Sequence, residues 1–533
     1  MGIYAVYSSR ITLTGNNASN NKLYFFIDFE IYWSGTGISV SRSNETLIFN
    51  NTVSNNIFGI NLYQSNNTDV TGNNVTANLQ HEGSTYYGTG IYISESKNIT
   101  VRDNVVSNNG AMGISVGSAT MGYPCSNNTI RNNTISGHAF GAYSYGLYVS
   151  WSRDNTIAEN SIFSNIYGVY VRYYSQNQTI VNNNVSLNSW GIYFDSSTNN
   201  TIINNNLFKN VDGITFENYA NHNKILFNNI LNTTSFGIYI RSNSRNNLVI
   251  GNNISNNSRG VRFTQSNNNT IFGNTISSNT NDGLVIYYYS SFNEVIGNNI
   301  SSNNKGLIIT YGSYNTKVFH NNFIGNTEHV YTDMNSTWDN DYPSGGNYWS
   351  NYTGVDFKSG ISQNDTGSDG IGDAKHVINQ NNTDRYPLMA PYSTFDVGTW
   401  NGTPYNADVV SNSTVSDFHF DPQEGPFLKF NVTGQEGTAG FCRVAIPKNL
   451  LWAQDGQWIV LVGDAPITNY TTASDQNCTY LYFTYGHSTK TVQITGTNVI
   501  PELSSTTITQ LLMILAMLAT AFATRKFQKE PES

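Results

Sequence analysis

Short apolar segments separated by asparagine-rich turns recur along the first 330 residues of the chain. A representative unit is NNTIFGNTISSNTNDGLVIYYYSS (residues 268–291), which contains three such segments. None of them is long enough for a helix, and no helical period is present. Three short strands in twenty-odd residues are typical of a coil whose strands stack in parallel on those of the next coil. The pattern predicts a parallel β-helix over residues 1–330.

A glycine followed by an aliphatic residue marks the start of one strand in each predicted coil. From Gly146 onward, successive glycines of this kind are 22, 23, 22, 24, 23, 23 and 23 residues apart, which sets the length of a coil. Longer steps earlier in the chain predict loops inserted at HEGSTYY and SATMGYPCS. About 13 coils are expected, which begin at Gly2, Gly37, Gly59, Gly90, Gly113, Gly146, Gly168, Gly191, Gly213, Gly237, Gly260, Gly283 and Gly306.

A second register consists of asparagines that stand two residues before the first apolar residue of the third strand in each coil. A column of identical amides can hydrogen-bond along the stack and tolerates the left-handed turns of such corners. We interpret this column as a structural asparagine ladder without chemistry. Its members are Asn51, Asn73, Asn133, Asn160, Asn183, Asn205, Asn228, Asn252, Asn274, Asn298 and Asn321, with Asp103 as the one acidic exception.

Beyond residue 330 the repeat gives way to other patterns. Residues 331–394, with several Trp, Pro and Gly, are expected to close the β-helix. Residues 395–500 contain long alternating strands such as FLKFNVTG, which predict a β-sandwich, immunoglobulin-like in outline. The apolar stretch from Thr506 to Thr524 is long enough for a transmembrane helix, and the basic residues within 525–533 predict a cytoplasmic tail. The rest of the chain is then expected on the extracellular face of the cell membrane.

The amino-terminal residues MGIYAVYSSRITLTGNN lack the basic and apolar regions of a secretory signal, although the predicted location requires export. They read as the middle of a repeat. We therefore expect that the chain is truncated at its N-terminus or begins at a misassigned start codon.

Composition narrows the choice of partners. Charged residues make up 11% of the chain, its net charge is −9 and its pI is near 5.3. No basic stripe is available to neutralise phosphates, which argues against nucleic acid as a partner. The three cysteines fit no zinc or iron–sulfur spacing. Cys442 and Cys478 are expected either to form a disulfide, which suits an extracellular domain, or to remain two buried thiols.

Three further motifs, NYWSNY, DGIGD and DRYPLM, follow the coils between Gly345 and Met389. With the asparagine-rich coils, they resemble the NosD-like β-helix family, often labelled periplasmic copper-binding repeats, over roughly residues 1–392. The resemblance implies a right-handed parallel β-helix with a compact closing segment, and an accessory role in maturing a copper enzyme. The expected fold class is thus all-β: a right-handed parallel β-helix solenoid followed by a β-sandwich and one C-terminal transmembrane helix.

The end of the chain is similar to archaeal C-terminal sorting signals, in which a Pro-Glu-Phe motif precedes a membrane helix and a basic tail. Pro501 and Glu502 match this motif, whereas Leu503 stands where the signal has Phe, which leaves processing open. Sequons such as Asn412-Ser-Thr are consistent with surface glycosylation. Both features agree with an archaeal-type surface protein.

Copper and calcium are the two metals for which the sequence is a possible source of ligands. Copper is not expected, because the eight histidines are scattered and no Met or Cys cluster joins them, whereas copper sites gather soft ligands. Calcium is better provided for, since Asp365, Asp369 and Asp373 stand at relative positions one, five and nine, with Gly370 at position six. The run departs from that pattern at the third position and at the position of the bidentate glutamate. The alternative is a polar Asp-Gly turn.

Two rows of side chains on the outward face of the glycine-started strand are the candidate binding site. Positions one and three past the glycine are apolar and face inward, so positions two and four face outward. Stacked tyrosines beside paired charges are the kind of surface that binds a sugar chain. The flanking arginines are expected to keep both carboxylates ionised. The alternative is an ordinary solvated sheet face. The two rows comprise Tyr148, Tyr170, Tyr193 and Tyr239, and Arg172, Asp195, Glu217 and Arg241.

These features predict a membrane-anchored surface protein that acts as a glycan-binding adhesin or a structural stalk. The alternatives are a carbohydrate-active enzyme of the polysaccharide lyase or epimerase type and a NosD-like accessory protein that handles metal. Motifs of β-helix enzymes, such as Asp-Pro-His-Asp and Gly-His-Gly, are missing, so no catalytic residue is predicted. The partners expected are a polysaccharide or surface glycan and the membrane, and the sequence leaves the oligomeric state undetermined.

Overall fold

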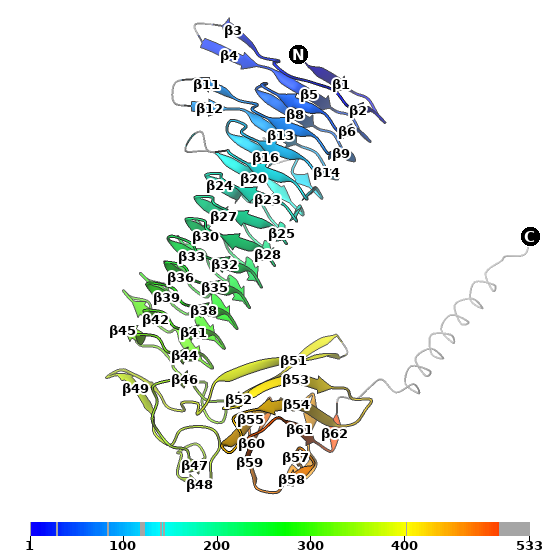
Figure 1. Ribbon diagram of the computed structural model, residues 1–533. Coiled ribbons are helices and arrows are strands. Elements are labelled where there is room, and N and C mark those ends of the chain that lie inside the picture. The colour runs from blue at the N-terminus through cyan, green and yellow to red at the C-terminus, as the bar shows by residue number, and fades with distance from the viewer. Residues whose placement is uncertain are drawn as a thin grey trace, which may run out of the picture. The chain divides into compact units, whose positions relative to one another are not determined.

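The structure is a computed structural model that describes residues 2–27, 30–82, 85–117, 123–138, 141, 144–400 and 402–499. It divides into two units, each of which is described by itself (Figure 1). The first comprises the residues up to 341 with 345–353 and 374–388, and the second comprises residues 342–344, 354–373 and those from 389 onward. The predicted transmembrane helix and basic tail lie outside the described residues. Within the ranges given above, no helix is long and apolar enough to cross a bilayer.

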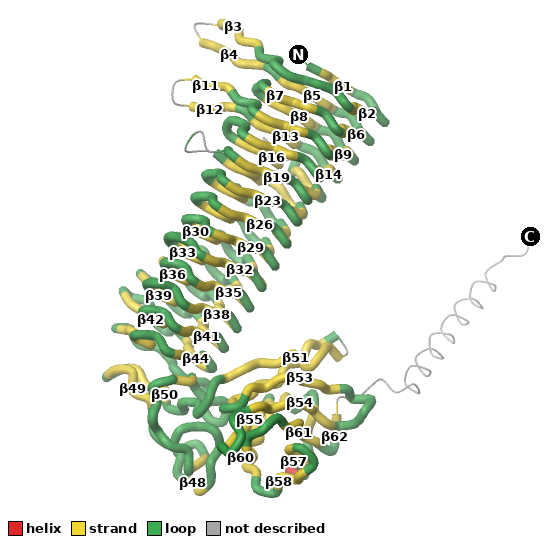
Figure 2. The backbone as a smooth tube through the Cα atoms, in the orientation of Figure 1, coloured by secondary structure: helices red, strands yellow, loops and turns green. Residues whose placement is uncertain are grey.

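The first unit is an all-β solenoid of right-handed type with about 13 turns, as the repeat and the family resemblance together predicted. One coil contains β27 (Trp190–Asp195), β28 (Thr201–Ile203) and β29 (Asn206–Phe208), and β30 (Asp212–Glu217) opens the next coil. Corresponding strands pair in parallel from coil to coil. Among the described residues they build one sheet of 14 strands and two sheets of 13, whose stacked coils are visible in Figures 1 and 2.

Two antiparallel hairpins are inserted into early coils. One pairs β3 (Leu23–Ile27) with β4 (Glu30–Ser34), and the other pairs β11 (Gln80–Glu82) with β12 (Thr85–Tyr87). The second hairpin coincides with HEGSTYY, which confirms an insertion there. The first five residues of the other expected insertion, SATMGYPCS, lie outside the described residues.

Inward-facing side chains fill the solenoid, as the alternation predicted. Ile192 and Phe194 are fully buried, and Phe194 packs edge-on against Phe216 of the next coil with 5.3 Å between ring centroids. The repeat glycine stands where neighbouring coils approach closely, because a Cβ built on Gly191 would lie 2.6 Å from the carbonyl oxygen of Gly213. The backbone approach therefore excludes any side chain at this position.

Buried amides run along all three corners of the coil. In the coil of β27 they are Asn200, Asn205 and Asn210, which are 0% to 1% exposed. Nδ2 of Asn205 donates to Oδ1 of Asn228 in the next coil at 3.0 Å, and also to two backbone carbonyls. The hydrogen bonds confirm the predicted ladder, and two further ladders at the other corners were not identified from the sequence.

One predicted member of the ladder is wrong. Asn104 and not Asp103 occupies the column, since Nδ2 of Asn73 donates to Asn104 Oδ1 at 3.0 Å. Asp103 is instead exposed and forms an ion pair with Arg102. The strand here begins with two valines, Val105 and Val106, and the first of them faces outward. The rule of two residues before the first apolar residue therefore pointed to Asp103, one residue before the true position. A shift of one residue moves a side chain to the opposite face.

Aromatic and acidic residues close the end of the first unit. Trp349 stacks on Phe323 of the last coil with 4.4 Å between ring centroids, and its Nε1 donates to the buried Asp384 at 2.9 Å. Arg385 forms an ion pair of 2.6 Å with the buried Asp339. These contacts explain two of the motifs that follow the repeat, because NYWSNY supplies the tryptophan and DRYPLM supplies the aspartate and the arginine.

The second unit contains two antiparallel five-stranded sheets with one shared core. Leu428 and Phe430 from one sheet and Leu481 and Phe483 from the other are buried in that core. The only helix among the described residues is the 3₁₀ turn η1 (Gln454–Gly456). The first sheet contains β51 (Tyr392–Trp400), β52 (Thr403–Ser411), β55 (Ala439–Pro447), β60 (Cys478–Gly486) and β59 (Tyr470–Ser474). The second contains β53 (Thr414–Phe420), β54 (Phe427–Thr433), β61 (Lys490–Thr495), β57 (Ile459–Val462) and β58 (Ala465–Ile467).

The predicted disulfide between Cys442 and Cys478 is not formed, and both thiols are free. The two residues lie on the paired strands β55 and β60, but Cys442 pairs with Phe483 and Cys478 pairs with Pro447. Five residues along the strands therefore separate them, which corresponds to roughly 16 Å. A disulfide requires Cα atoms closer than about 7 Å. Sequence proximity did not reveal the register of the two strands.

Candidate functional site

Six aromatic side chains pack together on the outward face of the 14-stranded sheet. They come from β20 (Tyr145–Ser150), β24 (Tyr167–Arg172) and β27, which are neighbours in that sheet. The rings of Tyr167 and Trp190 stack with 4.6 Å between centroids, and those of Tyr170 and Tyr193 meet edge to face at 5.1 Å. We call this cluster the aromatic patch; its members are Tyr145, Tyr148, Tyr167, Tyr170, Trp190 and Tyr193.

The aromatic patch differs from the tyrosine row that the sequence predicted. Tyr170 and Tyr193 are each only 7% exposed. The other aromatic rings of the patch, from the same and from neighbouring coils, cover their faces. Tyr148, Tyr167 and Trp190 remain half-buried and form the accessible part of the patch. The prediction that all four tyrosines present open faces is therefore wrong for the two central ones.

Half of the aromatic patch was missed by sequence reasoning. Tyr145, Tyr167 and Trp190 each stand immediately before the repeat glycine, three positions before the tyrosine of the predicted row. Strict alternation puts residues three apart on opposite faces of a strand, so it did not predict that these side chains join the tyrosines. Their packing against the tyrosine row is seen only in the structure.

Tyr239, the fourth predicted tyrosine, lies outside the aromatic patch. Thr215 of β30 stands between Tyr193 and Tyr239 in the register of the sheet. Tyr239 packs instead against Phe236 of its own strand at 4.6 Å between ring centroids, with the guanidinium of Arg241 at 5.1 Å from its ring.

The structure brings the four predicted charged side chains together as two ion pairs. Arg172 lies 3.8 Å from Asp195, and Arg241 lies 2.9 Å from Glu217. Each carboxylate also accepts a hydrogen bond from a tyrosine of the aromatic patch: Tyr170 donates to Asp195 and Tyr193 donates to Glu217. We call these four residues the charged row. Both carboxylates are held by cations and phenols, so the charged row is electrically balanced.

Burial decides the protonation of the phenols in the aromatic patch. Removal from water raises the pKa of Tyr148 and, more strongly, that of Tyr170, whose pKa the nearby Asp195 carboxylate raises further. Both hydroxyls therefore stay protonated at neutral pH and act as hydrogen-bond donors. The aromatic patch presents neutral rings, and its charge lies only in the adjacent row.

A pocket in the first unit is lined by His329, Ser350 and His376. Of these, Ser350 and His329 lie as close together as a serine nucleophile and its base. Nε2 of His329 lies 3.2 Å from Oγ of Ser350, and Nδ1 lies 3.3 Å from Nδ2 of Asn326. The Asn326 amide is oriented by the ladder, since its oxygen accepts from Asn303, so Nδ2 must donate to His329. Nδ1 is thus the acceptor and Nε2 carries the proton, which leaves no base for Ser350.

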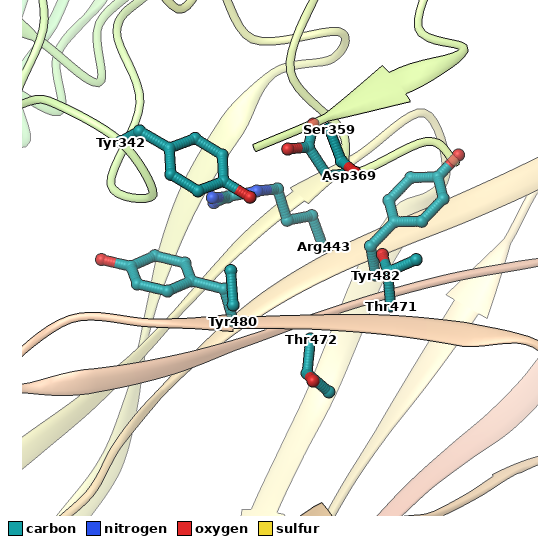
Figure 3. A pocket seen from close by; sticks show the side chains of 9 residues that line it. Tyr342, Ser359, Asp369, Arg443, Thr471, Thr472, Tyr480 and Tyr482 are labelled. Atoms are coloured by element: carbon teal, nitrogen blue, oxygen red, sulfur yellow. The ribbon is translucent and has the colours of Figure 1, made fainter. Parts of the chain in front are cut away.

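A small pocket in the second unit surrounds Arg443 (Figure 3). The arginine is 4% exposed, its guanidinium lies 4.5 Å from the centre of the Tyr480 ring, and it donates to the carbonyl of Pro343. Tyr342 and Asp369 line the same space. The cavity of about 40 Å³ holds only a few water molecules, which excludes a sugar ring.

The three aspartates of the predicted calcium loop have different surroundings. Asp365 is exposed on β48 (Asp365–Thr366), whereas Asp369 is buried, which raises its pKa. The Asp373 carboxylate accepts from the backbone N–H groups of Phe357 and Lys358. Across the described residues, no group of three or more His, Cys, Asp or Glu side chains is placed to hold a metal ion. Calcium binding here stays a prediction, without a preformed site in the described part of the chain.

Fold and surface together define a parallel β-helix protein with an aromatic outer patch. The family model described as periplasmic copper-binding protein (NosD) matches residues 1–88, 80–219 and 208–354. Since these matches extend over more than half of the 533 residues, the chain belongs to the NosD family. The expected family resemblance is thereby confirmed. No curated protein matches the chain.

Solved structures similar to the chain include an epimerase, a lyase and a tailspike protein. The Azotobacter vinelandii mannuronan C-5 epimerase AlgE4 A-module is 16% identical, with a TM-score of 0.43, over 57% of this chain and 91% of that one. Pectate lyase Pel9A is 15% identical, with a TM-score of 0.37, over 46% of this chain and 72% of that one. The Dettilon tailspike protein is 12% identical, with a TM-score of 0.33, over 86% and 87%. At such identities the likeness concerns the fold alone.

The description of the family names copper, a metal that requires several suitable ligands close together. Copper sites gather imidazole, thiolate or thioether ligands. The metal-binding side chains of the described ranges form no group of three or more that could hold an ion. Cys125 is buried in the first unit and Cys442 in the second. These residues do not fit a copper centre, and no step of the function below passes through copper.

Proposed function

We propose that the outward face of the 14-stranded sheet binds a polysaccharide chain without cleaving it. The observation that carries this proposal is the aromatic patch. Its three half-buried rings form a continuous apolar surface beside charged groups, an arrangement that stacks on sugar rings and hydrogen-bonds to their hydroxyls. In this role the protein acts as a glycan-binding adhesin or stalk.

The charged row favours binding over catalysis. Asp195 and Glu217 each face an arginine and accept a hydrogen bond from a tyrosine. A general acid or base must exchange a proton with the substrate, and a carboxylate held by two donors is poorly disposed to do so. We therefore expect retention of glycans without release of reducing or unsaturated ends.

Retention of polysaccharides by the purified full chain tests the proposal. Trp190→Ala should weaken retention on an array of neutral and uronic glycans by about fivefold, because a lost aromatic stack costs on the order of 1 kcal/mol. Tyr289→Ala is the matched control, since Tyr289 is an exposed aromatic residue of the first unit that lies outside the patch. Absence of binding by the unaltered protein, or an equal loss in both variants, would contradict the proposal.

An assay for reaction products on the same set of glycans distinguishes binding from the enzymatic alternative. Depolymerisation or epimerisation that disappears in Asp195→Asn or Glu217→Gln would replace the binding function with that of a polysaccharide lyase or epimerase. Such an outcome would still locate the function on the same face of the sheet.

The proposed location is the extracellular face of the cell membrane, with Thr506 to Thr524 as the anchor. The support is the length and apolarity of this stretch and the cations that follow it. Protease added to intact cells should remove the repeat region and spare the tail after Arg525. A repeat region protected from protease would exclude this location.

A further inference from the structure

Ser413 and His487 form a close hydrogen-bonded pair in the second unit. Ser413 lies in the turn between β52 and β53, and His487 directly follows β60. Ser413 Oγ and His487 Nε2 are 2.8 Å apart, although 74 residues separate them in the chain. This distance is that of a hydrogen bond between a hydroxyl and a ring nitrogen, within the reach that a nucleophile and its base require.

The hydrogen bonds around His487 fix which ring nitrogen carries the proton. The hydroxyl of Thr438 donates to the carbonyl of Gln435 at 2.7 Å, so its oxygen must accept from His487 Nδ1, which lies 2.5 Å away. With the proton on Nδ1, Nε2 is the acceptor and receives the hydroxyl of Ser413. The direction is opposite to that found for His329 and Ser350, where Nε2 is the donor.

Two glycines hold the imidazole of His487 in a narrow slot. A Cβ on Gly434 would lie 2.3 Å from Cδ2 of the ring, and a Cβ on Gly440 would lie 2.6 Å from the same atom. His487 as a whole is only 8% exposed, and its backbone N–H donates to the carbonyl of Thr438 at 2.8 Å. The base is therefore fixed in position by packing as well as by hydrogen bonds.

A second donor lies beside the serine oxygen. Tyr485 Oη is 2.7 Å from Ser413 Oγ, and since Ser413 gives its proton to His487, the tyrosine must donate to Ser413. Burial raises the pKa of Tyr485, and the Cys442 thiol raises it further, so the phenol stays protonated.

Space for a ligand adjoins this group. Ser413 is half-buried and lines a cavity of about 350 Å³ together with Pro391, Phe395 and Val415. Its lining is mixed, since Ser393, Asn412 and Thr414 lie beside these apolar residues, and it leaves room for a small acyl group next to Ser413.

We propose that Ser413 and His487 form a nucleophile and general base for acyl transfer from small esters. Ser413 Oγ attacks the ester carbonyl carbon while its proton passes to His487 Nε2. The carbon–alkoxy bond then breaks, and the leaving alcohol takes the proton from Nε2, which leaves an acyl ester on Ser413. In the second half, water adds to that carbonyl and gives a proton to Nε2, and Ser413 leaves and takes the proton back. Thr438 is a positioning residue, since it acts through His487.

Labelling of the full chain with an alkyl phosphonofluoridate tests the proposal. Peptide mass spectrometry should find the phosphonyl group on Ser413, and His487→Gln should slow the labelling by about a hundredfold or more, the usual contribution of a general base. Ser416→Ala should leave the rate unchanged, since Ser416 is an exposed serine of the next strand without a histidine. Failure of the unaltered protein to become labelled at Ser413 would overturn the proposal, whatever the variants do.

Substitution of Thr438 separates a positioning role from a structural one. Thr438→Val removes the acceptor of the Nδ1 proton and should slow both labelling and p-nitrophenyl acetate hydrolysis, whereas Thr438→Ser keeps the hydroxyl and should restore them. Equal rates in all three proteins, or equal losses in the two variants, would show that the hydrogen bonds only stabilise the fold.

Discussion

The hydroxyl of Tyr170 donates a 3.1 Å hydrogen bond to the carboxylate of Asp195, its diagonal neighbour one coil further along the β-helix. This bond joins the aromatic patch to the charged row. It also fixes the ring of Tyr170 against Tyr193, so the outer surface of the sheet is organised across coils rather than within one strand.

Removal of that hydroxyl should cost stability. Tyr170→Phe keeps the ring packing but leaves Asp195 without one of its donors, which should lower the free energy of unfolding by about 1 kcal/mol. Urea denaturation measures the change. Tyr239→Phe is the control, because the hydroxyl of Tyr239 donates no bond to a carboxylate of the charged row, and it should have little effect. Equal losses would show that the hydrogen bond to Asp195 contributes nothing specific.

The amide ladder should be more sensitive than any surface asparagine. Asn228→Ala removes the acceptor for Asn205 and leaves buried polar groups without partners on both sides, each at a cost of about 1 to 3 kcal/mol. Asn206→Ala removes an exposed amide of β29 and should change stability by less than about 0.5 kcal/mol. Thermal unfolding of the two variants compares them, and similar Tm values would refute the structural role of the ladder.

Any side chain in place of the repeat glycine should destabilise the β-helix. Gly191→Ala places a methyl carbon 2.6 Å from a carbonyl oxygen of the next coil, so the two coils must separate, and the loss should be on the order of 4 kcal/mol. Gly273 has φ of 63° with no atom near its Cβ position, so Gly273→Ala should cost only about 1 to 2 kcal/mol of backbone strain. The order of the two unfolding midpoints decides whether steric exclusion is the reason for the repeat.

His138 replaces an asparagine in one buried ladder, and its titration should make stability depend on pH. Burial lowers its pKa to about 4, below the 6.5 of a free imidazole, so the unfolded chain binds the proton more readily than the folded one. Stability is therefore fully present above pH 6.5 and is lost as the pH falls toward 4, by roughly 3 kcal/mol in all.

Substitution of this histidine should remove that dependence. Asn109 donates its backbone N–H to Nδ1 of His138 at 3.1 Å, and the asparagine of His138→Asn can accept the same bond. Urea midpoints measured from pH 7 to pH 4 should fall for the unaltered protein and fall less for the variant. Parallel curves would mean that other groups cause the acid sensitivity.

Sequence alone determined the solenoid, because the information for it is local. Glycine spacing gave the length of a coil, and the alternation of apolar residues placed Ile192 and Phe194 inside, since successive side chains of a strand must point to opposite faces. The ladder followed from the same period, apart from the strand with two valines, where either could have faced inward. The closing motifs indicated where the repeat ends, but they did not show which residues they contact.

Only the tertiary structure decided which surface groups are accessible and which distant groups meet. Residues of neighbouring coils are more than twenty positions apart in the chain, so the covering of Tyr170 and Tyr193 depends on ring packing between coils that no local pattern contains. The register of β55 and β60 likewise keeps Cys442 and Cys478 apart, whereas chain distance suggested a bond. Ser413 and His487 become neighbours because turns between antiparallel strands return to the same edge, a property of the folded sheets and not of either segment.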